Sequence, residues 1–257
     1  MVISEADMLA MVAGFIWPLM RIGAMFVAVP VFSIRAVPAR VRLIAALAIT
    51  LLVMPLLPPL PETTMFSAAG MMISLQQIMI GLISGFILQM VFAAVVFAGQ
   101  GVAYSMGLGF ASMVDPQTGL QVPVVAQFYV VTTTLVFLMM NGHLLLIEML
   151  LDSFTTLPIA ADGLGRTDIW SIIAWSSRIF AAGVLMALPV MASLLLVNVS
   201  FGVATRAAPQ LNIFSVGFPV TLMLGLLLIW LTLPDVLENF SGLLTDSYTL
   251  IGQLLQL

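Results

Sequence analysis

The stretch Gly81-Leu-Ile-Ser-Gly-Phe-Ile-Leu-Gln-Met-Val-Phe-Ala-Ala-Val-Val-Phe-Ala-Gly-Gln100 decides the fold class, because it contains no charged side chain. It lies inside a longer uncharged run between Glu62 and Asp115. About 20 apolar helical residues cross the hydrocarbon core of a bilayer. A helix also pairs its own backbone groups, which a lone strand in hydrocarbon does not. We therefore predict a membrane-embedded helix here.

The rest of the chain has the same character. Hydrophobic residues make up 62% of the 257 residues and charged residues only 7%, whereas soluble domains contain roughly a quarter of charged residues. No segment alternates in the manner of a membrane β-barrel strand. The sequence therefore predicts an all-α membrane protein with about six hydrophobic segments. They lie at about 8–34, 43–61, 65–100, 122–151, 169–200 and 213–234.

Several features within these segments favour contacts with protein. The run after Glu62 is too long for one span and contains several glycines, so we predict a broken helix there. Arg21 and Arg178 lie inside apolar segments, where a charge costs a few kcal/mol. We expect both arginines to face protein or trapped water. The candidate polar or subunit-contact residues are Arg21, Gln76, Gln89, Gln100, His143, Arg178 and Arg206.

Small residues indicate where helices pack closely, and the charges indicate how the chain is oriented in the membrane. Gly81-Leu-Ile-Ser-Gly85 has a spacing that allows close helix contact. Arg35, Arg40 and Arg42 follow the first segment and Arg206 follows the fifth, so the positive-inside bias places both loops in the cytoplasm. Acidic residues precede the first apolar run, unlike a secretory signal peptide, and we expect that run to be retained.

Composition argues against catalysis and nucleic-acid binding. The chain has no cysteine, which excludes thiol nucleophiles and cysteine-ligated zinc. It has no lysine, so a Walker lysine and a Schiff base are also excluded. The net charge of −4 is small and scattered. His143 stands in an apolar segment without a second ligand nearby, so a structural role is favoured over a metal or proton-transfer role.

The segment 105–119 is the most informative one for function. Gly107 and Gly109 permit positive φ angles, so the helix should break here. Asp115-Pro116 suits a helix start as well as a β-turn. The segment is either a mobile apolar plug that closes a pore by excluding water or an ordinary connector. The plug residues would be Gly107, Leu108, Gly109, Phe110, Met113, Asp115 and Pro116.

The residues from Pro234 onward predict a separate amphipathic helix. An apolar face with three- and four-residue steps is formed by Leu237, Phe240, Leu244, Tyr248, Ile251 and Leu255. Its charges are acidic, which does not suit anionic headgroups. We expect this helix to dock on a partner protein, and a free amphipathic tail is the alternative.

The whole pattern resembles the FliR family of flagellar type III export-gate proteins. Leu144 departs from it, because many members carry a second histidine there, and this further weakens a metal role for His143. The matching blocks follow one another along nearly the whole chain. They are Pro30-Val-Phe-Ser33, Val37-Pro-Ala-Arg-Val41, Gln76-Gln-Ile-Met-Ile-Gly-Leu82, Met106-Gly-Leu-Gly-Phe-Ala111, Val114-Asp-Pro116, Asn141-Gly-His143, Ser153-Phe-Thr-Thr-Leu-Pro158, Ala187-Leu-Pro189, Arg206-Ala-Ala-Pro-Gln-Leu-Asn-Ile-Phe214 and Gly217-Phe-Pro219.

The resemblance implies a gate subunit in the bacterial inner membrane, within the flagellar basal body. FliP-like, FliQ-like, FlhB-like and FlhA-like proteins would be its partners, and unfolded flagellar proteins its cargo. It implies a FliP-like part over 1–168 and a FliQ-like helical hairpin over 169–257. It also implies that the loop 105–119 is the pore plug and that the family sits partly above the bilayer plane. On composition, we expect no bound cofactor, metal or nucleic acid.

Two other functions remain open from the residues. A small-solute secondary transporter would use Arg21, Arg178 and His143 as site residues within the membrane. A gate subunit of a virulence injectisome would have the same architecture and a different cargo.

Overall fold

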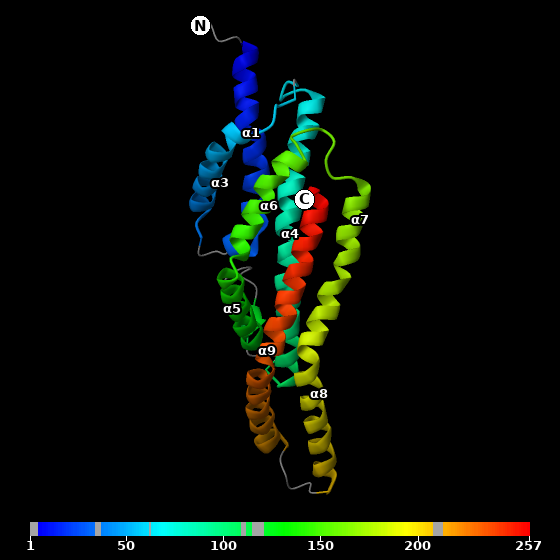
Figure 1. Ribbon diagram of the computed structural model, residues 1–257. Coiled ribbons are helices and arrows are strands. Elements are labelled where there is room, and N and C mark those ends of the chain that lie inside the picture. The colour runs from blue at the N-terminus through cyan, green and yellow to red at the C-terminus, as the bar shows by residue number, and fades with distance from the viewer. Residues whose placement is uncertain (1–4, 34–36, 62, 109–111, 115–120, 208–212) are drawn as a thin grey trace. The chain divides into compact units, whose positions relative to one another are not determined.

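The computed structural model describes residues 5–33, 37–61, 63–108, 112–114, 121–207 and 213–257 (Figure 1). Its helices confirm the all-α prediction. They are α1 Glu5–Ala28, α2 Pro30–Ser33, α3 Ala39–Val53, the 3₁₀ turn η1 Met54–Leu56, α4 Ala68–Ser105, α5 Val124–Met139, α6 Gly142–Thr156, α7 Arg166–Trp175, α8 Ser177–Ala207 and α9 Ile213–Leu255.

The apolar helices agree with the predicted hydrophobic segments. Five stretches are long and apolar enough to cross a membrane, and a sixth is the pair α5 and α6, which bends by 59°. Asn141 stands at this bend with a φ of 55°. The predicted segment 122–151 is thus two helices joined at a left-handed residue, a conformation that asparagine adopts more readily than most residues.

Helix α4 is continuous over 38 residues, so the break predicted for the run between Glu62 and Asp115 does not fall inside this helix. Gly81, Gly85, Gly99 and Gly101 all lie inside the helix without interrupting it. The break comes only after Ser105. The other end of α4 is capped by Ser67, whose Oγ accepts a 3.0 Å hydrogen bond from the backbone N–H of Gly70.

Helix α9 runs for 43 residues through Pro219 and Pro234. The residues after Pro234 are helical as predicted, but they continue α9 instead of forming a separate helix. Phe240, Leu244 and Ile251 are buried by this chain. The expected docking of this face on a partner protein is therefore wrong, because the chain itself covers the face.

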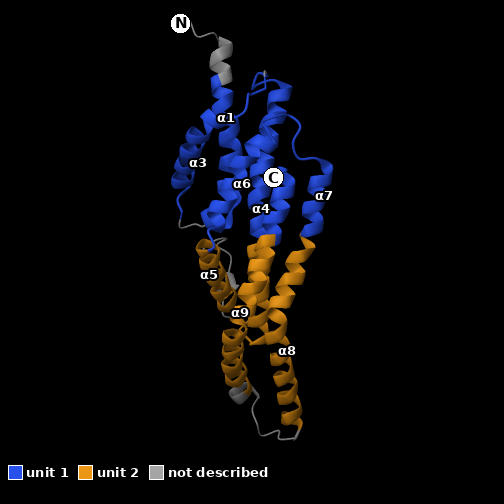
Figure 2. Cartoon of the chain, viewed as in Figure 1, with its two compact units in different colours: residues 1–90, 140–175, 246–257 blue, residues 91–139, 176–245 orange. Residues whose placement is uncertain are grey.

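The chain forms two compact units, each built from distant stretches of sequence (Figure 2). Unit 1 comprises 1–90, 140–175 and 246–257, and unit 2 comprises 91–139 and 176–245. Unit 1 contains α1, α3, α6 and α7, and unit 2 contains α5 and α8. This division follows spatial contacts, whereas the division into 1–168 and 169–257 is a statement about relatedness and stays a prediction.

Candidate functional site

Arg21 of α1 is fully buried in unit 1 and forms four hydrogen bonds. Its Nε donates to Gln77 Oε1 at 2.7 Å, and its Nη1 donates to the backbone oxygen and the Oγ of Ser153 at 3.0 and 2.9 Å. Its Nη2 donates to the backbone oxygen of Leu157 at 2.9 Å. The guanidinium carbon also lies 4.3 Å from the centre of the Phe154 ring. The prediction that Arg21 faces protein is confirmed.

The acceptors show what Arg21 does. Ser153 lies in the last turn of α6 and Leu157 is its C-cap. The last carbonyl groups of a helix lack partners within the helix and carry a partial negative charge. Arg21 therefore acts as a cationic cap on the C-terminus of α6, and Gln77 holds the guanidinium from α4. All four acceptors are neutral groups, so the arrangement stabilises structure and leaves little of the side chain for a ligand.

Close packing of α1 on α4 places Arg21 at this point. A Cβ at Gly81 would fall on the backbone oxygen of Arg21, and a Cβ at Gly85 would come within 2.5 Å of the Cβ of Ala28. The indole N–H of Trp17 donates to Ser74 Oγ across the same pair of helices at 3.1 Å. The expected close contact at the Gly81–Gly85 spacing is thus confirmed.

The candidate residues chosen from the sequence include Gln76 but not Gln77, although both amides lie in this segment and Gln77 is the buried one. Gln77 precedes Gly81 by four residues and Gly85 by eight, so all three lie on one face of α4. The spacing of Gln77 from the two glycines could therefore have identified it from the sequence as a buried residue at the contact with α1. Gln76 instead accepts a 3.2 Å hydrogen bond from the backbone N–H of Leu164.

The other polar candidates are more accessible. Gln89 and Arg178 are exposed in this chain, whereas Gln100 and His143 are partly buried. Arg206 is exposed in the last turn of α8, where a cation suits the negative end of the helix. The prediction that Arg178 faces protein or trapped water is untested by a single chain and stays a prediction.

At the start of the predicted plug loop, α4 ends in a Schellman motif. The backbone N–H of Gly107 donates to the oxygen of Tyr104 at 3.1 Å, and that of Leu108 donates to the oxygen of Ala103 at 2.9 Å. Gly107 has a φ of +78°, the left-handed conformation that this motif requires. The predicted helix break is confirmed. Gly107 is a defined helix stop, because both of its characteristic hydrogen bonds are present.

A short ladder of strands closes the other end of the loop. Strand β1 (Ser112–Val114) pairs antiparallel with β2 (Gln121–Pro123), and Met113 faces Val122 in the register. Helix α5 begins directly after β2. The plug candidates Gly109, Phe110, Asp115 and Pro116 lie outside the described residues.

Helices of unit 2 pack around the end of α4. The side-chain amide of Asn198 donates to the Ser105 oxygen at 3.5 Å. A Cβ at Gly225 would come within 2.6 Å of the Met106 side chain, so α9 approaches α4 closely. The start of the loop is thus held by both α8 and α9.

These features define a helical membrane protein with a helix stop at Gly107 and a short strand pair before α5. Residues 12–247 match the family described as bacterial export proteins, family 1. The chain is 40% identical to flagellar biosynthetic protein FliR of Pectobacterium carotovorum subsp. carotovorum over 97% of this chain and 95% of the relative. It is 38% identical to FliR of Escherichia coli K12 over 94% of this chain and 92% of the relative. It is also 32% identical to FliR of Bacillus subtilis 168 over 84% of this chain and 84% of the relative. The chain belongs to the FliR family of bacterial export proteins.

Proposed function

We propose that this chain is a subunit of the flagellar protein-export apparatus and forms part of a conduit for unfolded flagellar proteins. The names of its relatives support the first statement, since those that cover 84–97% of this chain are flagellar biosynthetic proteins. They also favour a flagellar cargo over that of an injectisome. The apparatus would lie in the bacterial inner membrane, at the flagellar basal body.

The length of the apolar helices is the main observation in favour of assembly with partner subunits. Helix α9 has 43 residues and α4 has 38, which correspond to about 65 and 57 Å at 1.5 Å per residue. The hydrocarbon core is only about 30 Å thick. Large apolar side chains such as Leu196 and Val203 of α8 remain exposed in the single chain, at 69% and 64%. Lipid alone does not cover helices of this length, so protein partners must contribute.

FliP-like and FliQ-like subunits are the proposed partners, and FlhA-like and FlhB-like proteins would join them. The division into a FliP-like part (1–168) and a FliQ-like hairpin (169–257) would let this chain pack beside both kinds of subunit. The conduit itself would lie between subunits, since an opening that admits even one helix must be about 10–12 Å wide.

We further propose that residues 105–119 plug this conduit. The Schellman motif at Gly107 and the pairing of β1 with β2 support this, because they fix where the chain leaves α4 and hold Ser112–Val114 beside the strand that leads into α5. Leu108, Phe110 and Met113 would supply apolar bulk. A narrow apolar constriction loses water readily and therefore blocks ions without a charged gate.

The test is a length-preserving variant in which Leu108, Phe110 and Met113 are replaced by serine. We expect membranes that contain the partner subunits to become leaky to small ions, because the apolar seal is lost while the helix stop and strand backbone remain. The matched control is Phe66→Ser, which removes an exposed apolar side chain outside the loop. If the triple variant assembles normally and adds no leak, the segment is a connector only.

A small-solute transporter is less well supported. It would need Arg21 as a site residue, yet four neutral groups of the chain already occupy this guanidinium. Purifying the tagged chain from membranes distinguishes the two functions. Recovery with FliP-like and FliQ-like subunits supports the export gate, whereas a stable solitary protein that binds a solute contradicts it.

A further inference from the structure

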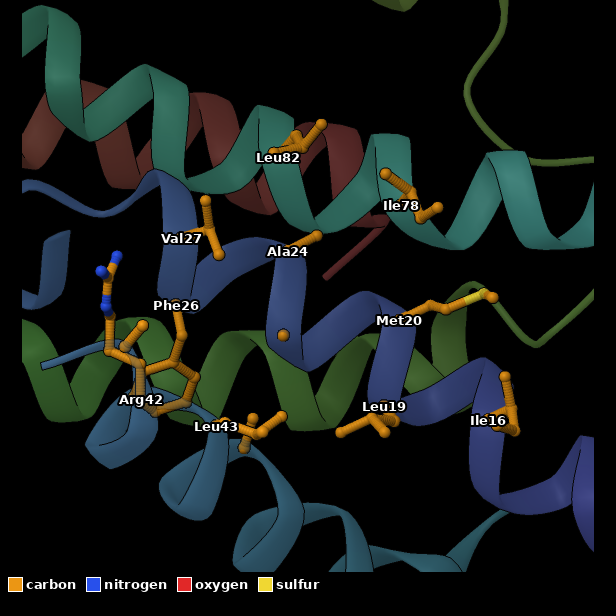
Figure 3. A pocket seen from close by; sticks show the side chains of 13 residues that line it. Ile16, Leu19, Met20, Ala24, Phe26, Val27, Arg42, Leu43, Ile78 and Leu82 are labelled. Carbon is orange, nitrogen blue, oxygen red and sulfur yellow. The ribbon is translucent and has the colours of Figure 1, made fainter.

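An apolar groove of about 770 Å³ lies in unit 1 between α1, α3 and α4. This volume lies in the range of ligand pockets, about 300–1,000 Å³. Figure 3 shows Arg42 beside Phe26 at one end of the groove and Ile16 at the other. Leu19, Leu43 and Leu82 contribute to the apolar walls. Arg42 is the charged residue of the lining.

The length of the groove matches one leaflet of a bilayer. Its α1 lining runs from Ile16 to Val27, which is about 16 Å of helix at 1.5 Å per residue. Half of a hydrocarbon core about 30 Å thick is about 15 Å. The groove follows the axis of α1, a helix with a candidate membrane-spanning stretch at Met11–Ala28. An acyl chain of one leaflet would lie in the same direction.

The charge stands at the end of the groove where a headgroup would lie. Arg42 belongs to the first turn of α3, where the candidate span Ala39–Leu56 begins. Its Nε is buried and has no hydrogen-bond acceptor within the described part of the chain. A buried donor without an acceptor is costly, so this site favours an external acceptor, ideally an anionic one. Basic pockets between membrane helices bind anionic headgroups for the same reason.

We propose that the groove binds an anionic phospholipid, with an acyl chain along α1 and the phosphate at Arg42. The positive-inside bias of the arginines around Arg42 assigns the lipid to the cytoplasmic leaflet, which carries anionic lipids. The site does not depend on the plug, so either proposal can fail without the other.

Two pairs of variants separate the headgroup from the acyl chain. Arg42→Gln removes the cation at the groove without breaking a side-chain hydrogen bond in the described part of the chain. Arg40→Gln is its control, because Arg40 is exposed, two residues earlier in α3, and does not line the groove. A Cβ at Gly23 meets nothing within 4 Å and Gly23 lines the groove, so the side chain of Gly23→Phe would occupy part of the groove. Gly242→Phe is the control, since its Cβ also meets nothing within 4 Å.

The measurement uses the detergent-purified assembly that contains the full chain, exposed to phosphatidylglycerol or phosphatidylcholine. Retained lipid is counted by native mass spectrometry. We expect phosphatidylglycerol to be preferred, and Arg42→Gln to weaken its retention about tenfold, in line with the loss of one charge-assisted hydrogen bond. Arg40→Gln should leave retention unchanged. Gly23→Phe should abolish retention of both lipids, and Gly242→Phe should not.

Equal retention by Arg42→Gln and Arg40→Gln would overturn the proposal, as would equal binding of the two lipids. Because the chain has no cysteine, Leu43→Cys gives a unique probe in the groove lining, at a side chain that is 56% exposed. Photocrosslinking from this cysteine should capture lipid. Capture of a partner subunit instead would show that protein occupies the groove, and it would likewise overturn the proposal.

Discussion

Replacing Arg21 with methionine should destabilise the protein strongly, because it removes a donor from several buried acceptors at once. Ser153 would keep part of its bonding, since its backbone oxygen also accepts from Leu157 N–H and its Oγ also donates to Leu150. Gln77 Oε1 and the Leu157 oxygen accept no second hydrogen bond in the described part of the chain. These two acceptors would be left buried and unpaired.

The size of the effect follows from these two acceptors. Each buried polar group without a partner costs about 1–3 kcal/mol, which gives about 2–6 kcal/mol in total. Relief from burying the guanidinium charge offsets part of this. We therefore expect a loss of about 3 kcal/mol. At roughly 2–4 °C per kcal/mol for chains of this size, the thermal midpoint of the detergent-purified protein should fall by about 6–12 °C.

The controls isolate the hydrogen bonds. Arg40→Met removes an exposed arginine and should change stability by less than about 0.5 kcal/mol. The thermal midpoint of Arg21→Lys should lie between those of wild type and Arg21→Met, because an ammonium group cannot reproduce the planar arrangement of guanidinium donors. The double variant Arg21→Met with Gln77→Leu should lose less unfolding free energy than the sum of the losses in the two single variants. The reason is that donor and acceptor then disappear together. A midpoint for Arg21→Met within about 2 °C of wild type would refute the capping role.

Two glycine variants give further tests. Gly81→Ala should destabilise the protein by about 1–3 kcal/mol, because its Cβ would fall on the backbone oxygen of Arg21. The control Gly242→Ala should leave stability unchanged, since its Cβ meets nothing within 4 Å. Equal thermal midpoints of the two variants would contradict the close packing at Gly81. Gly107→Val should cost about 1–3 kcal/mol through its positive φ, whereas Gly107→Asn should be tolerated; both midpoints are measured on the purified protein, and motility is scored alongside. Equal behaviour of the two variants would show that the left-handed conformation is unimportant.

The buried environment of Arg21 was predictable from the sequence, but its partners were not. A charge in an apolar segment requires polar contacts, and this physical rule holds without any knowledge of the fold. The partners lie 56, 132 and 136 residues away along the chain. Only the packing of α1, α4 and α6 brings them together. The FliR resemblance marked the blocks that contain Gln77 and Ser153 without showing that they meet.

The glycines of α4 show how the same residue supports opposite predictions. Glycine favours a helix break through its conformational freedom. It also favours helix continuity in a membrane protein, where a missing Cβ lets another helix approach. Gly99 illustrates the second case, since a Cβ there would meet the backbone of Ala126. Composition alone does not separate the two roles. Gly81, Gly85 and Gly99 recur on one face of the helix, and this spacing favours the packing role.

Gly107 leads to a revised view of how a plug in this loop could move. A hinge requires a residue whose backbone exchanges freely between conformations, but Gly107 is fixed by two hydrogen bonds that end α4. Opening a path at this point would break both bonds and expose the last carbonyl groups of α4. The pairing of β1 with β2 restrains the loop at Ser112–Val114 in the same way. If the loop opens the conduit, it therefore either breaks these hydrogen bonds or leaves both anchors in place, and Gly107 sets the direction in which the chain leaves α4.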